Sequence, residues 1–155
     1  MSAGVEWALH CCVVISQADE PVPAARLATF HEVSRSYLAK NLQALSRAGI
    51  VRTTEGRDGG YELTRSASKV SVLEVVQAVD GPDPAFRCTE IRRRGPLPAT
   101  REMCRRPCGI SRVMAAAEQA WRDSLAAVTI ADLAADLDAS TGGTGLEGLR
   151  TWLST

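Results

Sequence analysis

The chain has 155 residues, of which 45% are hydrophobic and 23% charged, and its 18 basic and 18 acidic side chains cancel. This length predicts one domain with an appendage, and the absence of a long apolar run excludes a membrane-spanning protein. The neutral total hides an asymmetry, because residues 87–112 carry eight arginines and two glutamates, a net charge of +6. Three of the five cysteines lie in this basic segment, and clustered cysteines in an intracellular chain favour metal binding or redox sensing.

The apolar stretch near the N-terminus does not have the pattern of a signal peptide. Glu6 and His10 interrupt it, and no basic segment precedes it. We therefore expect a cytoplasmic protein without a membrane partner. Cys11 and Cys12 lie in this stretch, and we expect them to be buried as small hydrophobic side chains.

The N-terminal part of the chain predicts three helices. Apolar residues at helical spacing indicate a helix over 5–17. A short second helix over 24–30 follows, with Pro23 suited to its first turn. Ser34 is typical of a helix N-cap, and the third helix continues from it until Gly49 stops it.

A hairpin and a fourth helix complete this part. Two β-rich stretches, 50–54 and 61–64, flank the glycine turn at 56–60, and a helix over 71–79 follows. The order of helix, short helix, turn, helix and hairpin is that of a winged helix-turn-helix. We therefore assign residues 1–81 to a DNA-binding domain.

The remainder of the chain predicts a loop, a long helix and a tail. Residues 82–109 are rich in proline and arginine and lack periodicity, and a loop of this length usually has a function. An apolar stripe indicates a long helix over 110–137, although Thr129 resembles a fresh helix start and indicates a kink or break. Residues 138–155, rich in Ser, Thr and Gly, are expected to form a flexible tail. The fold class is mainly α.

The candidate DNA contacts lie mostly on the predicted third helix. In a helix-turn-helix this helix enters the major groove and presents its N-terminal side chains to base edges. Arg35 can read guanine and Asn41 can read adenine, whereas the other polar side chains suit phosphates. Arg57, at the hairpin tip, can enter the minor groove or contact phosphate. An ordinary helical core with solvated polar residues is the alternative. The candidates are Ser34, Arg35, Ser36, Tyr37, Lys40, Asn41 and Arg57.

The candidate metal ligands come from two segments. Cys88, Cys104 and Cys108 lie in the basic loop, and their spacing is not the paired C-x2-C of a zinc ribbon. Glu6 and His10 are four residues apart on the first predicted helix, so both project from one face and can supply further ligands. Thiolates favour zinc or an iron–sulfur cluster, and histidine is compatible with either. The nearby arginines are expected to lower the thiol pKa values.

These segments together resemble the IscR/NsrR-type family of bacterial winged helix-turn-helix regulators with an iron–sulfur cluster. The resemblance spans about residues 4–137, and it implies a homodimer paired through the helix over 110–137 and a palindromic operator in double-stranded DNA. It also implies a [2Fe-2S] or [4Fe-4S] cluster between the cysteine loop and the N-terminal helix. The motifs that carry it are VSRSYLAK at 33–40, LQAL at 42–45, AGIV at 48–51, GRDGGYEL at 56–63 and VVQAVDG at 75–81.

The cysteine spacing departs from that family's pattern, in which three cysteines are closer and more evenly spaced. Here Cys104 lies far from Cys88 and only four residues before Cys108. We therefore favour a [2Fe-2S] cluster held by Glu6, His10, Cys88 and Cys108 over a site with three cysteines and one other ligand; [4Fe-4S] and zinc are the alternatives. Such mixed ligation raises the reduction potential, as histidine does in Rieske centres, and suits a one-electron switch.

The predicted function is a transcription regulator, a repressor, whose operator affinity changes with the redox state, nitrosylation or loss of the cluster. Trp7 is predicted to couple the cluster to the third helix, and simple packing is the alternative for this side chain. The alternative function is a zinc-stabilised or cluster-free DNA-binding or protein-interaction domain without redox sensing. No phosphate-binding loop or catalytic triad is present in the sequence, so we do not expect an enzyme.

Overall fold

The computed structural model describes residues 1–56 and 59–155, which form two compact units. The first unit consists of Met1–Pro82 and Leu125–Thr155, and the second of Asp83–Ser124. No helix in the described part of the chain is long and apolar enough to cross a membrane.

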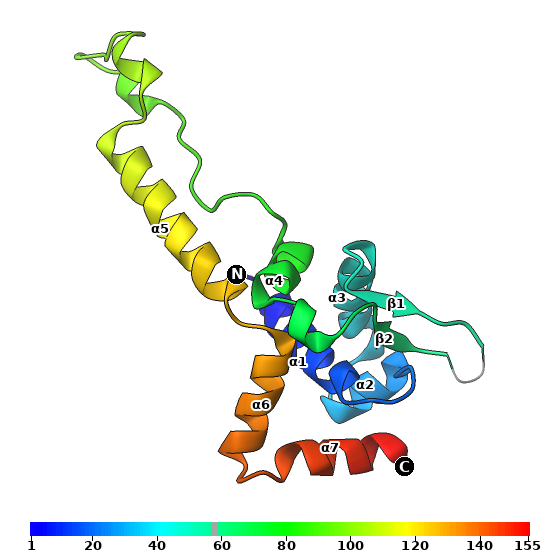
Figure 1. The fold of residues 1–155 in the computed structure, drawn as a ribbon. Helices are drawn as coiled ribbons and strands as arrows, with labels where there is room; N and C mark the ends of the chain where they lie inside the picture. Colours follow the sequence, from blue (N-terminus) through cyan, green and yellow to red (C-terminus); the bar gives the residue numbers. More distant parts are fainter. Residues whose placement is uncertain (57–58) are drawn as a thin grey trace. The chain divides into compact units, whose positions relative to one another are not determined.

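Three helices begin the first unit, as the sequence predicts. Helix α1 spans Ala3–Ser16, α2 spans Ala24–Phe30 and α3 spans Arg35–Arg47. Ser34 is the N-cap of α3, because its side-chain oxygen accepts a hydrogen bond from the backbone N–H of Tyr37. Helix α1 packs against α3 and other helices of this unit, so it forms the centre of the unit (Figure 1).

The wing consists of two short antiparallel strands, β1 at Val51–Thr53 and β2 at Tyr61–Leu63. Val22, between α1 and α2, forms a bridge with Tyr61 through two backbone hydrogen bonds of 2.9 Å. A β-carbon on Gly60 would lie 2.4 Å from the carbonyl carbon of Val22, so only glycine permits this approach. The wing is thereby attached to the connection that precedes the helix-turn-helix.

Helix α4 spans Val72–Asp80 and begins with a capping box. The Ser71 hydroxyl accepts a hydrogen bond from the Glu74 N–H, and the Glu74 carboxylate accepts one from the Ser71 N–H at 2.9 Å. Val75 and Val76 are buried on its inner face. The helix predicted over 71–79 is confirmed.

The helix predicted over 110–137 with a kink or break at Thr129 consists of two helices. Helix α5 spans Gly109–Ala126 and α6 spans Ile130–Ser140, and the break falls at Thr129, where the sequence indicated a kink or break. Thr129 and Asp132 form a capping box, which starts α6 afresh. The Ile130 N–H also donates a hydrogen bond to the carbonyl of a residue in the connection before α4, at 2.9 Å. These hydrogen bonds prevent α5 and α6 from forming one continuous helix.

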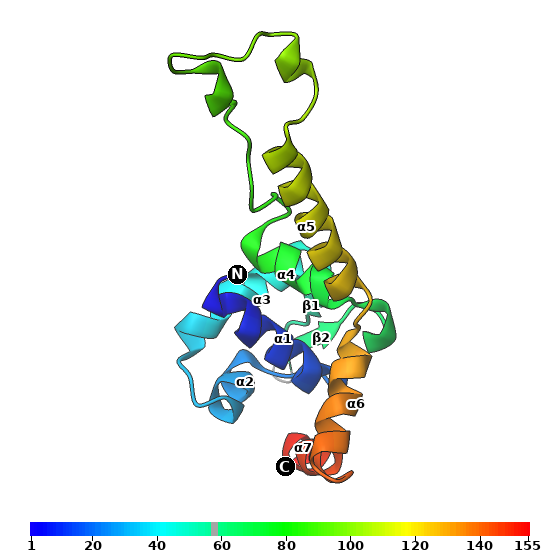
Figure 2. The same ribbon diagram turned by 90° about the vertical axis from the view of Figure 1, so that its left-hand side faces the viewer.

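The tail over 138–155 is not flexible throughout, contrary to our expectation, because helix α7 spans Gly145–Ser154. Leu149 is buried in the main core, and Leu146 and Leu153 pack against the same core. These three leucines recur at helical spacing and bury one face of α7, whereas the glycine-rich composition that suggested a linker is concentrated in the turn before it. Figures 1 and 2 both place α7 beside α2 and the end of α6.

The core of the first unit forms around α1. Cys11 and Cys12 are completely buried in it, together with Leu27 of α2 and Leu38 of α3. Burial raises the pKa of each of these two cysteine thiols to about 12. Both cysteines are therefore protonated core side chains, as expected.

The second unit contains the cysteine loop and most of α5. Two short 3-10 turns, η2 at Ile91–Arg93 and η3 at Met103–Arg105, are the regular elements of this loop. None of the residues of α5, all of which the structure describes, is buried.

Candidate DNA interface and metal ligands

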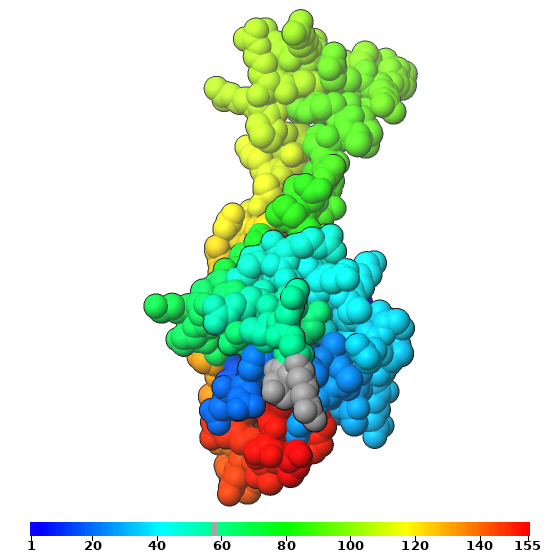
Figure 3. All heavy atoms as spheres, turned by 90° about the vertical axis from the view of Figure 1, so that its right-hand side faces the viewer, coloured from blue at the N-terminus to red at the C-terminus, as the bar shows by residue number. Residues whose placement is uncertain are grey.

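One side of α3 carries most of the predicted DNA contacts. Leu38, Leu42 and Leu45 face the core and are completely buried, so the opposite side of the helix faces outward. Atoms of α2 and α3, coloured from blue to cyan, are exposed on the face shown in Figure 3. The predicted contacts that are exposed are Ser34, Arg35, Ser36, Tyr37 and Lys40.

Asn41, which we predicted to read adenine, does not belong to this exposed surface. Its side chain is 6% exposed, because it lies on the same stripe of α3 as Leu38 and Leu42. A side chain buried between helices cannot reach a base edge. Asn41 comes three residues after Leu38 and one before Leu42. This place in the apolar stripe is the feature of the sequence that indicated its burial.

Two further residues that face outward on α3 were not among the predicted DNA contacts. Gln43 and Arg47 are exposed and continue the line of Ser36 and Lys40 at spacings of four and three residues. The Arg47 Nε donates a hydrogen bond to the backbone oxygen of Gln43 at 3.3 Å. The predicted contact Arg57 lies outside the residues that the structure describes.

A row of aromatic rings connects α1 with α3. The Trp7 ring meets the Tyr37 ring edge to face, with centroids 6.1 Å apart, and it lies 5.8 Å from the His31 ring. His31 in turn lies 5.8 Å from His10. Burial, with the charge of His10, lowers the pKa of His31. The four rings thus form a continuous row from His10 on α1 to Tyr37 on α3.

Glu6 and His10, two of the predicted ligands, are exposed on α1 in the first unit. The three predicted cysteine ligands belong to the second unit. Among the described residues, no three His, Cys, Asp or Glu side chains are close enough to hold a metal ion. The donor chemistry of thiol, imidazole and carboxylate nevertheless suits an iron–sulfur cluster or zinc.

Within the second unit, Glu90 connects two of the cysteines, a role that the sequence did not indicate. The Cys88 thiol donates to Glu90 Oε1 at 3.9 Å, and the Arg92 Nε donates to Glu90 Oε2 at 3.1 Å. Burial and a hydrogen bond to Glu90 raise the pKa of the Cys104 thiol, although Arg92 opposes the change. The arginines thus act on the Cys104 thiol in the expected direction, but burial and Glu90 outweigh them.

An apolar stripe is exposed along α5. Ile110 is 69% exposed and Val113 67%, and Met114 and Trp121 are also exposed. The four residues recur at spacings of three, one and seven residues, so they share one side of the helix. Exposed apolar patches of this kind are typical of interaction surfaces.

The chain matches the model of the family Rrf2, described as "Iron-dependent Transcriptional regulator", over residues 1–136. Over 76 residues it is 37% identical to the HTH-type transcriptional regulator IscR of Xenorhabdus nematophila, which covers 49% of this chain and 46% of that protein. IscR of Klebsiella pneumoniae is equally similar, with 49% and 47% covered. These alignments span about half the length of the curated relatives.

Two solved structures share the fold. CymR, the global cysteine regulator of B. subtilis, superimposes with a TM-score of 0.69 at 18% identity, covering 87% of this chain and 95% of that one. The IscR of T. potens gives a TM-score of 0.67 at 18% identity, covering 90% and 89%. The mainly helical fold with a two-stranded wing is therefore confirmed.

Proposed function

Since the chain belongs to the Rrf2 family of transcriptional regulators, we propose that it is a DNA-binding repressor whose operator affinity is switched by a [2Fe-2S] cluster. This family is one of regulators, so the chain is not an enzyme. The exposed side of α3 is the observation that carries DNA binding. Acting on chromosomal DNA, the protein works in the cytoplasm.

Helix α3 enters the major groove by its N-terminal end. Arg35 is exposed in the first turn and can donate two hydrogen bonds to a guanine. Lys40 and the Tyr37 hydroxyl are exposed on the same side and suit phosphate oxygens, which set the position of α3 on the duplex.

The protein acts as a homodimer paired through α5. The stripe that contains Ile110, Val113 and Trp121 is exposed in the single chain, and a second copy would remove it from water. A two-fold dimer presents two α3 helices related by the same axis, so the operator is a palindrome in double-stranded DNA.

Four residues are proposed to hold the cluster: Glu6 and His10 from α1, and Cys88 and Cys108 from the loop. When bound, the cluster supplies a reversible one-electron redox change. The two ligand pairs belong to different units, so loading requires α1 and the loop to meet, within one chain or between the chains of the dimer.

Trp7 is proposed to carry the redox signal to α3. It follows Glu6 in the chain, and its ring contacts Tyr37 of α3. Trp7→Ala should retain the cluster and bind operator equally in both redox states, whereas Trp7→Phe should keep a partial response. A wild-type redox response in Trp7→Ala would assign Trp7 to packing alone.

The proposed function is tested by purifying the full chain without oxygen and measuring visible absorption, iron and sulfide. The purified protein is then used to select operators from a random duplex library, and their affinity is measured in the oxidised and reduced states. We expect iron and sulfide in equal amounts and a redox-dependent affinity. Zinc, or no metal with unchanged DNA binding, would instead support a regulator without redox sensing.

A further inference from the structure

Helix α7 packs onto the helix-turn-helix from outside the stretch that defines the family. The family model matches residues 1–136, whereas α7 spans Gly145–Ser154. Leu149 is 6% exposed in the same core as Leu27 of α2. The helix is therefore a docked element of the first unit rather than a free extension.

Two side chains of α2, Arg26 and Phe30, contact Trp152 of α7. The guanidinium carbon of Arg26 lies 4.8 Å from the centroid of the Trp152 ring, and Arg26 Nη2 donates a hydrogen bond to the Trp152 backbone oxygen. The Phe30 ring meets the indole at 4.9 Å. Arg26 and Phe30 are four residues apart, so they hold Trp152 against one face of α2.

Arg26 has few polar partners apart from those on α7. Arg26 forms no ion pair with the described residues, and its buried Nε has no hydrogen-bond partner there. A guanidinium stacked on an indole and bonded to the same residue is directional as well as attractive. The pair therefore fixes Arg26 of α2 against Trp152 of α7.

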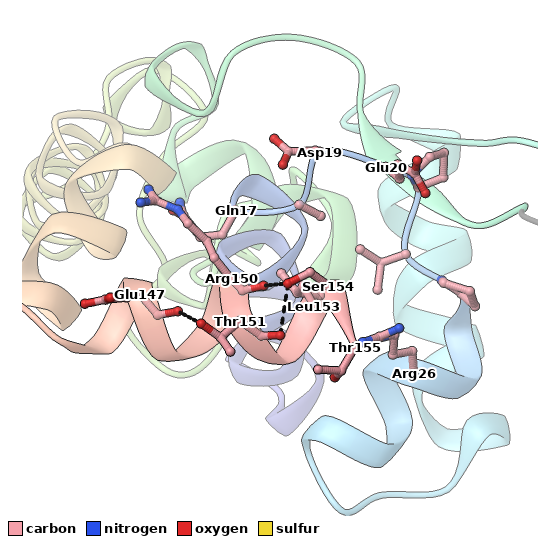
Figure 4. A pocket seen from close by; sticks show the side chains of 14 residues that line it. Gln17, Asp19, Glu20, Arg26, Glu147, Arg150, Thr151, Leu153, Ser154 and Thr155 are labelled. Carbon is pink, nitrogen blue, oxygen red and sulfur yellow. Dashed lines mark hydrogen bonds between the residues drawn. The ribbon is translucent and has the colours of Figure 1, made fainter.

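Part of the junction between α7 and the helix-turn-helix is open. A pocket of about 740 Å³ separates the C-terminal part of α7 from the connection between α1 and α2, and Arg26 and Arg150 are among its lining residues (Figure 4). Arg150 Nη2 donates to the Gln17 side chain at 2.8 Å across this junction. Helix α7 thus holds the start of the helix-turn-helix at a few points.

The orientation of α3 is coupled to that of α2 by the turn that joins them. The turn between them is closed by hydrogen bonds from the Val33 N–H to the Ala28 oxygen at 3.0 Å and from the Glu32 N–H to the Thr29 oxygen at 3.2 Å. Helices α2 and α3 also pack against each other. A displacement of α2 therefore moves the N-terminal end of α3, where the exposed Arg35 lies.

We infer that α7 is a positioning element, in which Trp152 holds α2 in the orientation from which α3 enters the major groove. This inference rests on the proposed DNA binding. It means that operator affinity depends on a helix that makes no base contact itself. Trp152 and Arg26 are the two positioning residues of this junction.

The test compares Trp152→Ala, Trp152→Phe and Thr151→Ala in the full chain. Thr151 is a matched control, because it is exposed on α7 and its hydroxyl bonds only within the helix, to the Glu147 oxygen at 2.9 Å. We expect Trp152→Ala to weaken binding to a selected operator about threefold to tenfold at a temperature where circular dichroism shows an intact fold. Trp152→Phe should restore most of the affinity, and Thr151→Ala should match wild type.

Hydrogen exchange of α2 separates positioning from stability. Trp152→Ala should accelerate exchange over Ala24–Phe30 and leave the buried amides of α1 protected. A lower melting temperature with unchanged operator affinity would overturn the inference. If Trp152→Ala does not fold, Arg26→Gln is used in its place, with the same expected weakening. If the wild type binds no duplex, the proposed function fails, and unchanged exchange in α2 overturns the positioning role separately.

Discussion

The side-chain carboxamide of Asn41 on α3 lies directly against Gly4 of α1. A β-carbon placed on Gly4 would be 2.7 Å from Asn41 Oδ1 and 3.2 Å from a methyl group of Val79 on α4. Three helices therefore meet at a point that leaves room only for a glycine. Asn41, a polar residue of α3, therefore serves the packing of that helix.

Gly4→Ala is expected to destabilise the protein. Alanine gains about 1 kcal/mol in helix propensity, but crowding of this kind costs about 1–3 kcal/mol. The net loss should appear as a lower urea midpoint with an unchanged m-value. Gly148→Ala is the control, because a β-carbon on Gly148 in α7 would meet no atom within 4 Å. Equal stabilisation by the two substitutions would contradict the packing at Gly4.

Substitutions on α3 should separate DNA recognition from folding. Arg35→Ala is expected to cost about 1–3 kcal/mol of binding to operators with the preferred guanine and to relax the preference at that position. Lys40→Ala should weaken binding to all duplexes. It should also reduce the slope of the logarithm of the binding constant against the logarithm of the salt concentration by about one. Fluorescence anisotropy over a range of salt concentrations measures both effects.

Asn41→Ala should instead lower the free energy of unfolding, because it removes a buried side chain from between α1 and α3. Under conditions in which Asn41→Ala is still folded, it should keep the base preference of the wild type. An altered base preference with normal stability would place Asn41 in the DNA interface after all.

The three cysteines of the loop should differ in their effect on the cluster. Cys88→Ser and Cys108→Ser are expected to lose iron and sulfide, whereas Cys104→Ser should retain both. Cys104 is set apart because burial and its bond to Glu90 raise the pKa of its thiol, which disfavours the thiolate that binds metal. Chemical analysis after anaerobic purification measures the difference, and loss of iron from Cys104→Ser alone would reverse this ligand set.

The capping box of α4 should make stability depend on pH. Partial burial tends to raise the pKa of Glu74, but the hydrogen bonds from Ser71 and the charge of Arg65 outweigh it and lower the pKa below 4.5. Because the folded-state value is the lower one, this contribution is complete above the ordinary pKa and is lost as pH falls through the folded-state value. Glu74→Gln should therefore lose less stability on acidification than wild type. Parallel denaturation curves for the two proteins would exclude this role.

Much of the fold could be predicted because it depends on neighbouring residues. Ser34 as an N-cap, Gly49 as a helix stop and the leucine stripe of α3 act within one or two helical turns, and all three are present as predicted. The break at Thr129 is of the same kind, since its capping box joins residues three apart. These features predict the helix-turn-helix and the exposed polar side of α3.

The remaining features depend on residues that are far apart in the chain. The burial of Asn41 requires Gly4 and Val79, and the docking of α7 requires Arg26 to meet Trp152 across 126 positions. The bonds of Glu90 likewise depend on how the cysteine loop closes on itself. The local sequence determined which segments become helices and which side of α3 is polar. Only the tertiary structure decided which polar residues are buried and whether the tail is docked, because burial depends on the partner that covers each surface.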